Sequence, residues 1–189
     1  MQDHYFVAAP RVFAPAGPVP DPPPGLSWEG LMDQALDQAR LAAEAGEVPV
    51  GAVLAGPGGH ILARTGNAPV RRHDPTAHAE ILALRAGGAA LGNYRLAGCV
   101  LAVTLEPCAM CAGACVNARI KRIVFGAYDG KGGACGGVTD ITGCFCHRPE
   151  VKGGVLETEC AALLKEFFRA KRMTEAKRRA GKGEPAAAE

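Results

Sequence analysis

One short segment constrains the fold more than any other: an apolar run at residues 99–105 that is followed almost at once by Pro107. A run of this length, nearly free of polar residues, predicts a strand buried on both faces of its sheet. Proline is favoured at the first position of a helix, because its missing N–H would have no partner there. We therefore predict a buried strand at 99–105 and a helix at 107–117 directly after it.

Helix and strand signals alternate on both sides of this unit. Ser27 is a suitable N-cap for a helix that begins near Trp28, and Gly46 could end it. The Gly-rich stretch 129–154 carries no clear signal. The other expected elements are strands at 48–54, 61–65 and 120–125 and helices at 74–85 and 157–179. This alternation predicts an α/β domain built in layers.

Prolines set one end of the chain apart. Seven of them lie between Pro10 and Pro24, and proline cannot continue a helix or a central strand. Residues 1–25 are therefore expected to form a disordered tail, with a docking segment or a targeting remnant as the alternative. A second disordered tail is expected at 183–189, which places the domain at 26–182.

Nothing in the sequence indicates a membrane or secreted protein. It has no apolar stretch of about 18 residues, the length that a membrane span needs, and no basic start followed by an apolar run. A cytoplasmic location is the expectation. Disulfides are rare in that compartment, so the eight cysteines are expected to be thiols or metal ligands.

Charge is unevenly distributed along the chain. The net charge of +2 does not by itself indicate a nucleic-acid-binding protein. Eight basic and four acidic residues lie from Lys165 to the end, so that part carries +4 and the remainder −2. The helix expected at 157–179 carries most of this charge, and it could bind phosphates or could simply be solvated. The other candidate phosphate contacts are Arg71, Arg72, Arg95 and Lys131.

Two short segments carry candidate metal ligands: His78 with Glu80, and Cys108 with Cys111. Both are expected in the first turn of a helix, where the positive end of the helix favours a thiolate. Two cysteines and one histidine around zinc leave one tetrahedral position open, which is the arrangement of a catalytic site. Glu80 could point into the same cavity without binding the metal, and could move protons between a zinc-activated water and a leaving nitrogen. Hydrolytic deamination needs this combination.

The remaining cysteines leave alternatives open. Cys115 follows Cys111 by four residues on the same helical face, and as a fourth ligand it would close the site. A buried thiol is the expected reading instead. Cys144, Cys146 and His147 could bind a second metal, although their spacing in a Gly-rich loop is weak support. A structural zinc site or a redox pair would also explain a C-x-x-C motif taken alone.

Taken together, the two motifs resemble the H-x-E and P-C-x-x-C signature of zinc-dependent nucleobase deaminases. Longer segments are similar to bacterial tRNA-specific adenosine deaminases, a branch of the cytidine deaminase-like superfamily. They lie at 47–53, 72–80, 93–96, 104–114, 124–127 and 159–169. The resemblance covers roughly residues 28–180.

This resemblance implies a three-layer α/β/α fold around a central five-stranded mixed sheet. It also implies a homodimer with one Zn²⁺ per subunit, no organic cofactor, and conversion of the wobble adenosine of a tRNA anticodon loop to inosine. By position, Asn67 matches an asparagine that hydrogen-bonds the flipped base, and Asp129 matches an acidic residue that contacts the neighbouring sugar. A turn residue and a plain loop residue are the respective alternatives.

Two other functions share these motifs. A guanine or cytosine deaminase, acting on a free base or a nucleoside, would have the same metal ligands but no need of a basic final helix. A zinc-stabilised RNA-binding module would need a fourth protein ligand to the metal.

Overall fold

The protein is built around one five-stranded sheet. The structure is a computed structural model that describes residues 21–180. The strands are β1 (Gly51–Ala55), β2 (Ile61–Gly66), β3 (Val100–Leu105), β4 (Arg122–Ala127) and β5 (Glu150–Lys152). Their order is β2-β1-β3-β4-β5, with β1 antiparallel to β2 and β3, and with β3, β4 and β5 parallel. The predicted mixed sheet of five strands is confirmed.

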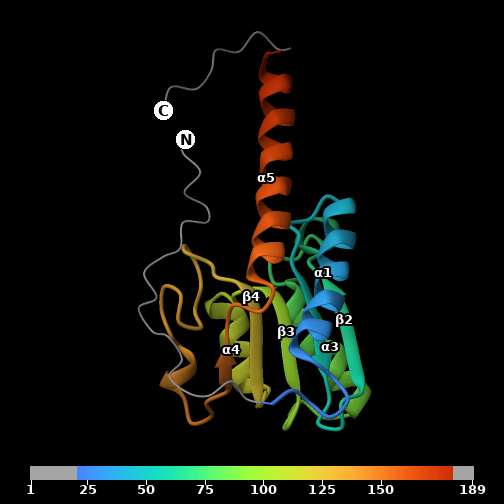
Figure 1. Ribbon diagram of the computed structural model, residues 1–189, viewed down its shortest axis with the longest axis vertical. Helices are drawn as coiled ribbons and strands as arrows, with labels where there is room; N and C mark the ends of the chain where they lie inside the picture. Colours follow the sequence, from blue (N-terminus) through green and yellow to red (C-terminus); the bar gives the residue numbers. More distant parts are fainter. Residues whose placement is uncertain (1–20, 181–189) are drawn as a thin grey trace.

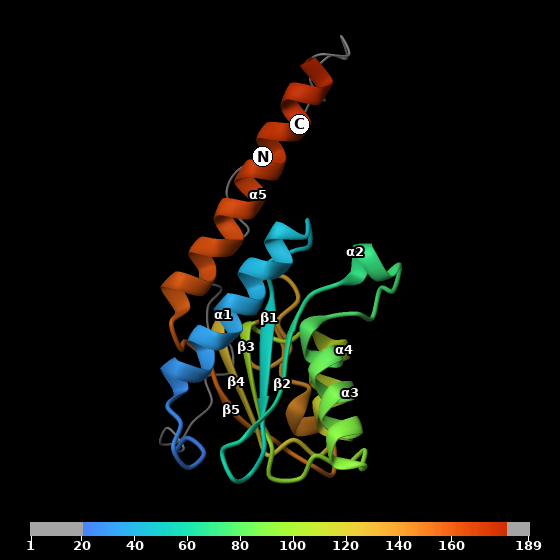
Figure 2. The same cartoon turned by 90° about the vertical axis from the view of Figure 1, so that its right-hand side faces the viewer.

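Helices cover both faces of this sheet. They are α1 (Trp28–Glu44), α2 (Pro69–Arg72), α3 (Ala79–Leu91), α4 (Ala109–Asn117) and α5 (Glu157–Ala180), with a short 3₁₀ turn, η2 (Thr142–Cys144). Helices α1 and α5 lie on one face, and α3 and α4 lie on the other (Figures 1 and 2). The predicted three-layer α/β/α fold is therefore confirmed. None of the described helices is long and apolar enough to cross a membrane.

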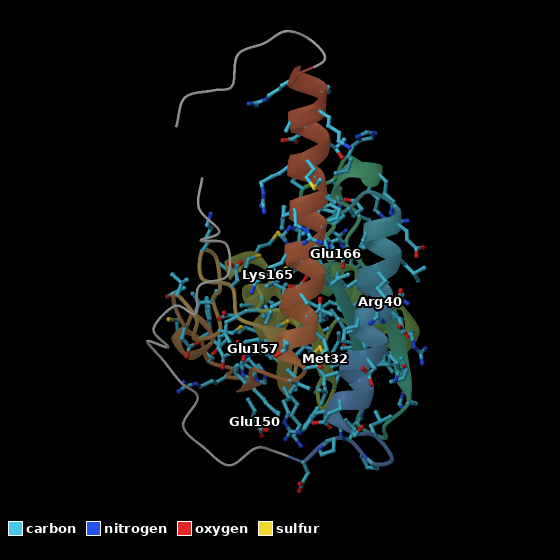
Figure 3. The ribbon with its side chains drawn as sticks, turned by 45° about the horizontal axis from the view of Figure 1, so that its top comes forward. Met32, Arg40, Glu150, Glu157, Lys165 and Glu166 are labelled. Carbon is cyan, nitrogen blue, oxygen red and sulfur yellow. The ribbon has the colours of Figure 1, made fainter. Side chains whose placement is uncertain are left out.

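Strand β3 is the centre of the core, as its apolar run predicts. Val100 to Thr104 are all buried. Successive side chains of a strand point to opposite faces, and here Leu101 and Val103 join the cluster under α3 and α4, whereas Val100 and Ala102 join the cluster under α1. The second cluster also joins Met32 on α1 to Cys160 on α5, two helices that lie side by side in Figure 3. One strand thus links both hydrophobic layers.

Most of the expected elements form, with shifted ends. The Ser27 hydroxyl accepts a hydrogen bond from the Gly30 N–H at 3.0 Å, so the N-cap of α1 is confirmed. The helix expected at 74–85 begins only at Ala79, because the Asp74 carboxylate accepts the Thr76 N–H at 2.8 Å and holds residues 74–76 in a turn. The helices α2 and η2 and the strand β5 were not expected.

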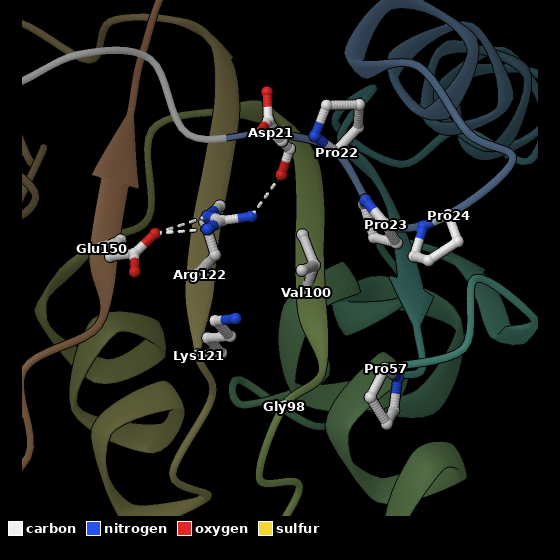
Figure 4. A pocket seen from close by; sticks show the side chains of 10 residues that line it. All are labelled: Asp21, Pro22, Pro23, Pro24, Pro57, Gly98, Val100, Lys121, Arg122 and Glu150. Atoms are coloured by element: carbon white, nitrogen blue, oxygen red, sulfur yellow. Dashed lines mark hydrogen bonds and ion pairs between the residues drawn. The ribbon is translucent and has the colours of Figure 1, made fainter.

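The N-terminal segment that the structure describes packs against the sheet. The Asp21 carbonyl accepts a hydrogen bond from the Arg122 guanidinium at 2.6 Å, while Glu150 binds the same guanidinium from β5 (Figure 4). The Trp28 ring lies 5.5 Å from Arg122, within the range of a cation–π contact. Ordered contacts therefore begin within the expected tail of residues 1–25; residues 1–20 and the expected tail at 183–189 lie outside the described residues.

Strand β1 packs closely against α1 at Gly51, and this contact yields a stability prediction. A Cβ atom on Gly51 would overlap the backbone of Ala35 and Ala39. Gly51→Ala should therefore destabilise the protein by about 1–3 kcal/mol, which corresponds to a fall of roughly 2–4 °C in Tm for each kcal/mol. Thermal unfolding measures this loss.

The matched control is Gly113→Ala on α4, where a Cβ meets no atom within 4 Å. Alanine favours a helix over glycine by about 0.5–1 kcal/mol, so this variant should unfold at the same temperature as the parent protein or slightly higher. Equal losses in both variants would contradict the packing argument.

Candidate metal centre and active site

His78 meets two cysteines that lie 30 and 33 residues further along the chain, Cys108 and Cys111, beyond the carboxyl end of β3. His78 occupies the N-cap position of α3, Cys108 occupies that of α4, and Cys111 lies in the first turn of α4. The His78 Nδ1 atom is 3.8 Å from the Cys108 Sγ atom and 3.5 Å from the Cys111 Sγ atom. The three ligand atoms all lie within 4.8 Å of one another. Tetrahedral zinc bonds of ordinary length place sulfur and nitrogen about 3.6 Å apart, so this geometry fits a zinc ion.

The electrostatics of the cluster also fit a cation. Hydrogen bonds from Cys111 and His78 lower the pKa of the Cys108 thiol to about 4. The hydrogen bond with Cys108, together with burial, raises the pKa of Cys111. A thiolate is thus already favoured at Cys108, and thiolate is the form that binds a metal ion.

Glu80 lies beside the cluster in the first turn of α3 and is only 3% exposed. Its Oε2 atom is the one buried side-chain polar atom without a hydrogen-bond partner among residues 21–180. Burial raises the pKa of this carboxyl group. A buried carboxylate oxygen without a partner is costly, and such a cost is typical of a group kept ready to react with a ligand.

Asn67 follows β2 and fixes the start of α3. Its Oδ1 atom accepts a hydrogen bond from the Ala79 N–H at 2.9 Å, between His78 and Glu80 in sequence. Its own backbone N–H donates to the Val50 carbonyl. The side chain is therefore buried next to the metal cluster, with its oxygen bonded to α3.

Asp129 follows β4 at the same edge of the sheet. The parallel register pairs Leu105 with Ala127, so Asp129 leaves the sheet beside the turn that carries Cys108. Its carboxylate accepts the Lys131 N–H at 2.9 Å, and its own N–H donates to Glu106. The structure thus brings the loop of Asp129 to the metal ligands.

The other cysteines do not join the cluster. Cys115 is buried in α4 among apolar residues, and burial raises its pKa. Cys144 and Cys146 are exposed, while the His147 Nε2 atom lies 2.7 Å from the Ile120 carbonyl oxygen. Over the described part of the chain, only His78, Cys108 and Cys111 form a group that could hold a metal.

Two buried carboxylates with backbone partners were not anticipated from the sequence. Glu106 accepts three backbone N–H groups from the loop after β4. Glu47 accepts the N–H groups of Val70 and Arg71, at the start of α2. The only sequence signal for either is an acidic residue next to an apolar run, since their partners are backbone atoms that any residue could supply.

The cavity drawn in Figure 4 is a separate feature. Residues at the amino ends of β3 and β4 line it, among them Val100, Lys121 and Arg122. The metal ligands lie beyond the carboxyl end of β3, at the opposite edge of the sheet. This cavity therefore has no part in the chemistry of the cluster.

Comparisons with known proteins agree with this site. The family described as "Cytidine and deoxycytidylate deaminase zinc-binding region" matches residues 27–127. A tRNA-specific adenosine deaminase of Agrobacterium fabrum is 49% identical, over 76% of this chain and 95% of that protein. A tRNA-specific adenosine deaminase of Bacillus subtilis is 47% identical, over 75% of this chain and 88% of that protein.

One similar protein is much longer. A tRNA(Ile)-lysidine synthase of Deinococcus deserti is 51% identical over 72% of this chain, but the match spans only 26% of that protein.

Solved structures also resemble the chain. One, from a study of A-to-I editing by deaminases of the tRNA wobble position, has a TM-score of 0.66 and 46% identity, covering 71% of this chain and 98% of that one. A guanine deaminase from Nitrosomonas europaea also has a TM-score of 0.66. Its identity is 26%, and the match covers 88% of this chain and 97% of that one.

The geometry of the cluster predicts which cysteines hold the metal. Cys111→Ala should lose nearly all bound zinc, because two ligands bind the ion far more weakly than three. Cys115→Ala should keep about one zinc per chain, because Cys115 lies outside the cluster. Elemental analysis of the purified, dialysed variants measures both. If Cys115→Ala lost its zinc as well, Cys115 would be a fourth ligand and the site would be closed.

Proposed function

Because the chain belongs to the family of zinc-binding cytidine and deoxycytidylate deaminases, we propose that it hydrolyses the wobble adenosine of a tRNA anticodon to inosine and ammonia. The observation that carries the reaction type is the three-ligand cluster beside the unpartnered oxygen of Glu80. The substrate is supported by the tRNA-specific relatives, which are nearly half identical over most of their own length.

The chain's own residues divide the chemistry between them. His78, Cys108 and Cys111 would hold a zinc ion, a Lewis acid that would activate a water molecule for attack. Glu80 accepts one proton from the attacking water and passes it to the ring nitrogen. It then accepts the second proton, from the hydroxyl group newly bound to the ring carbon, and delivers it to the amine, which departs as ammonia. The burial of Glu80 raises the pKa of its carboxyl group, so the carboxylate accepts the proton of the attacking water more readily than an exposed carboxylate would.

Asn67 and Asp129 are proposed to place the substrate. The Asn67 oxygen is bonded to α3, which leaves its amide nitrogen to donate a hydrogen bond to the flipped base. Asp129 lies on the loop beside Cys108 and would accept a hydrogen bond from the adjacent sugar. An anticodon base is already unpaired, so moving it into the site costs less than extruding a base from a duplex. A homodimer with one zinc per subunit and a cytoplasmic location remain the expectations for this function.

The final helix supports an RNA substrate. Its first half packs on the sheet through Cys160 and Leu164, whereas residues 169–179 are exposed and extend beyond the body of the protein (Figures 1 and 3). We call residues 169–179 the basic arm. Its one acidic residue is Glu175, and its six basic residues are Arg169, Lys171, Arg172, Lys177, Arg178 and Arg179. A surface of this charge suits a phosphate backbone and has no use in an enzyme for a free base.

The second candidate is a guanine deaminase. The structural similarity to the Nitrosomonas europaea enzyme is as high as that to the wobble-position deaminase, at lower sequence identity. The metal cluster would serve either substrate, so a direct comparison of substrates is needed.

That comparison is the first test. Anticodon stem-loops with adenosine or cytidine at the wobble position, and free guanine, are each incubated with the zinc-loaded protein. Nucleoside mass spectrometry should detect inosine from the adenosine stem-loop alone. Glu80→Gln is the control: it should retain zinc and lose nearly all turnover, because the proton acceptor is gone while the metal ligands remain. Turnover of guanine without inosine would replace this proposal with the second candidate.

The basic arm gives a second test, based on salt. Changing Lys177, Arg178 and Arg179 to Gln should weaken stem-loop binding and lower the slope of log affinity against log salt by roughly 0.7–0.9 for each phosphate contact that is lost. The control changes Arg40, Arg64 and Lys121 to Gln, which removes the same charge from the body of the protein. Binding titrations over a range of salt compare the two. If both triple variants change the slope equally, net charge and not the arm explains the binding.

A further inference from the structure

Glu106 has an unusual set of partners for a buried acid. It is only 2% exposed and lies between the end of β3 and the metal-ligand turn. Its Oε1 atom accepts the N–H groups of Cys135 at 3.0 Å and Gly137 at 2.7 Å, and its Oε2 atom accepts that of Asp129 at 3.1 Å. All three donors belong to one segment, residues 129–137, which we call the Asp129 loop. Backbone N–H groups therefore compensate the burial of this carboxylate.

The Asp129 loop is also bonded to the backbone around a metal ligand. The Ala134 N–H donates to the Pro107 carbonyl at 2.9 Å, and Gly133 pairs with Cys108 in an isolated antiparallel bridge. Glu106 precedes this turn by one residue. The Glu106 side chain and the backbone of residues 107–108 thus each form hydrogen bonds with the Asp129 loop.

The glycines of the loop fit this arrangement. A Cβ atom on either Gly133 or Gly137 would overlap the Glu106 carboxylate. Neither residue has a positive φ, so the close approach to Glu106, and not the backbone conformation, accounts for glycine there. The loop can wrap around the carboxylate only because both side chains are absent.

From these contacts we infer that Glu106 is a positioning residue. It holds the Asp129 loop against the backbone of Cys108, and so fixes the position of this metal ligand relative to Asp129. The part that concerns Asp129 as a substrate contact rests on the proposed function. The part that concerns Cys108 rests only on the metal cluster.

Glu47 provides a matched control for a buried carboxylate. It is 1% exposed and accepts two backbone N–H groups, those of Val70 at 3.1 Å and Arg71 at 2.9 Å. Its partners lie on α2 and not on the Asp129 loop. Glu47→Gln therefore removes a similar interaction without touching the Asp129 loop.

The test measures zinc loss and loop order in the full-length, zinc-loaded protein. Glutamine has only one acceptor oxygen, so Glu106→Gln leaves at least one of the three N–H groups without an acceptor. In Gly137→Ala, the added methyl group displaces the Glu106 carboxylate while Glu106 itself is kept. This second variant tests the role of Glu106 if Glu106→Gln does not fold. In a competition with a chelator, both variants should bind zinc about 10- to 100-fold more weakly. Amide hydrogen exchange should accelerate at residues 129–137.

Two controls separate positioning from general destabilisation. Glu47→Gln should speed exchange around residues 69–72 and keep the zinc affinity of the parent protein, and Gly113→Ala should change neither. Parental zinc affinity and loop exchange in both Glu106→Gln and Gly137→Ala would overturn the inference. Equal zinc loss in Glu106→Gln and Glu47→Gln would overturn it as well.

The contribution of Asp129 has its own readout. In stem-loop kinetics at saturating zinc, Glu106→Gln should raise KM more than it lowers kcat, because the displaced loop binds substrate while Glu80 keeps its place. A lower kcat at unchanged KM would overturn this part. If the parent protein makes no inosine, the proposed function fails, but zinc affinity and exchange still decide the role of Glu106.

Discussion

The architecture depends on the meeting of two helix N-termini at one edge of the sheet. Helices α3 and α4 both begin there, and each presents free N–H groups and a positive partial charge to the same small volume. Negative groups are favoured at such a point, and the chain places there the Cys108 thiol, whose pKa Cys111 and His78 lower, together with the carboxyl group of Glu80. Strand β3 makes the arrangement possible, because it is buried on both faces and delivers Cys108 to the start of α4 without a long loop. A cation that binds both sulfurs and His78 completes the balance of charge.

Three buried glutamates, Glu47, Glu80 and Glu106, show how structure and reactivity are separated. Glu47 and Glu106 have their oxygens bonded to backbone N–H groups, and each fixes one segment of chain. Glu80 is as deeply buried but keeps one oxygen without a partner. A buried carboxylate that is fully bonded is held in one state, whereas one that lacks a partner gains by binding a proton or a ligand. Burial alone therefore does not distinguish the reactive acid from the two structural ones; the hydrogen bonds do.

The sequence predicted those parts of the fold that depend on local patterns. The apolar run of β3, the Ser27 cap and the spacing of Cys108 and Cys111 each act within a few residues, and all three appear in the structure. The helix expected from residue 74 was wrong at its start, because a side-chain bond within the 74–76 turn competes with helical hydrogen bonds. Strand β5 has only three residues and no apolar pattern to reveal it. No local pattern predicts the role of Glu106, because its partners are backbone atoms 23 to 31 residues away.

Under the proposed function, the deamination chemistry and the binding of the RNA backbone by α5 lie in different parts of the chain. The metal ligands and Glu80 lie on α3, α4 and the end of β3, all within the region that matches the deaminase family. Helix α5 lies outside that region, and only its first half belongs to the hydrophobic core. The exposed half carries charge but almost no apolar surface, so core packing does not explain why the helix continues past residue 168. An isolated helix of that length has little stability of its own in water, so a charged partner would stabilise the exposed half. The proposed tRNA substrate would be such a partner, because its phosphate backbone complements the six basic residues at 169–179.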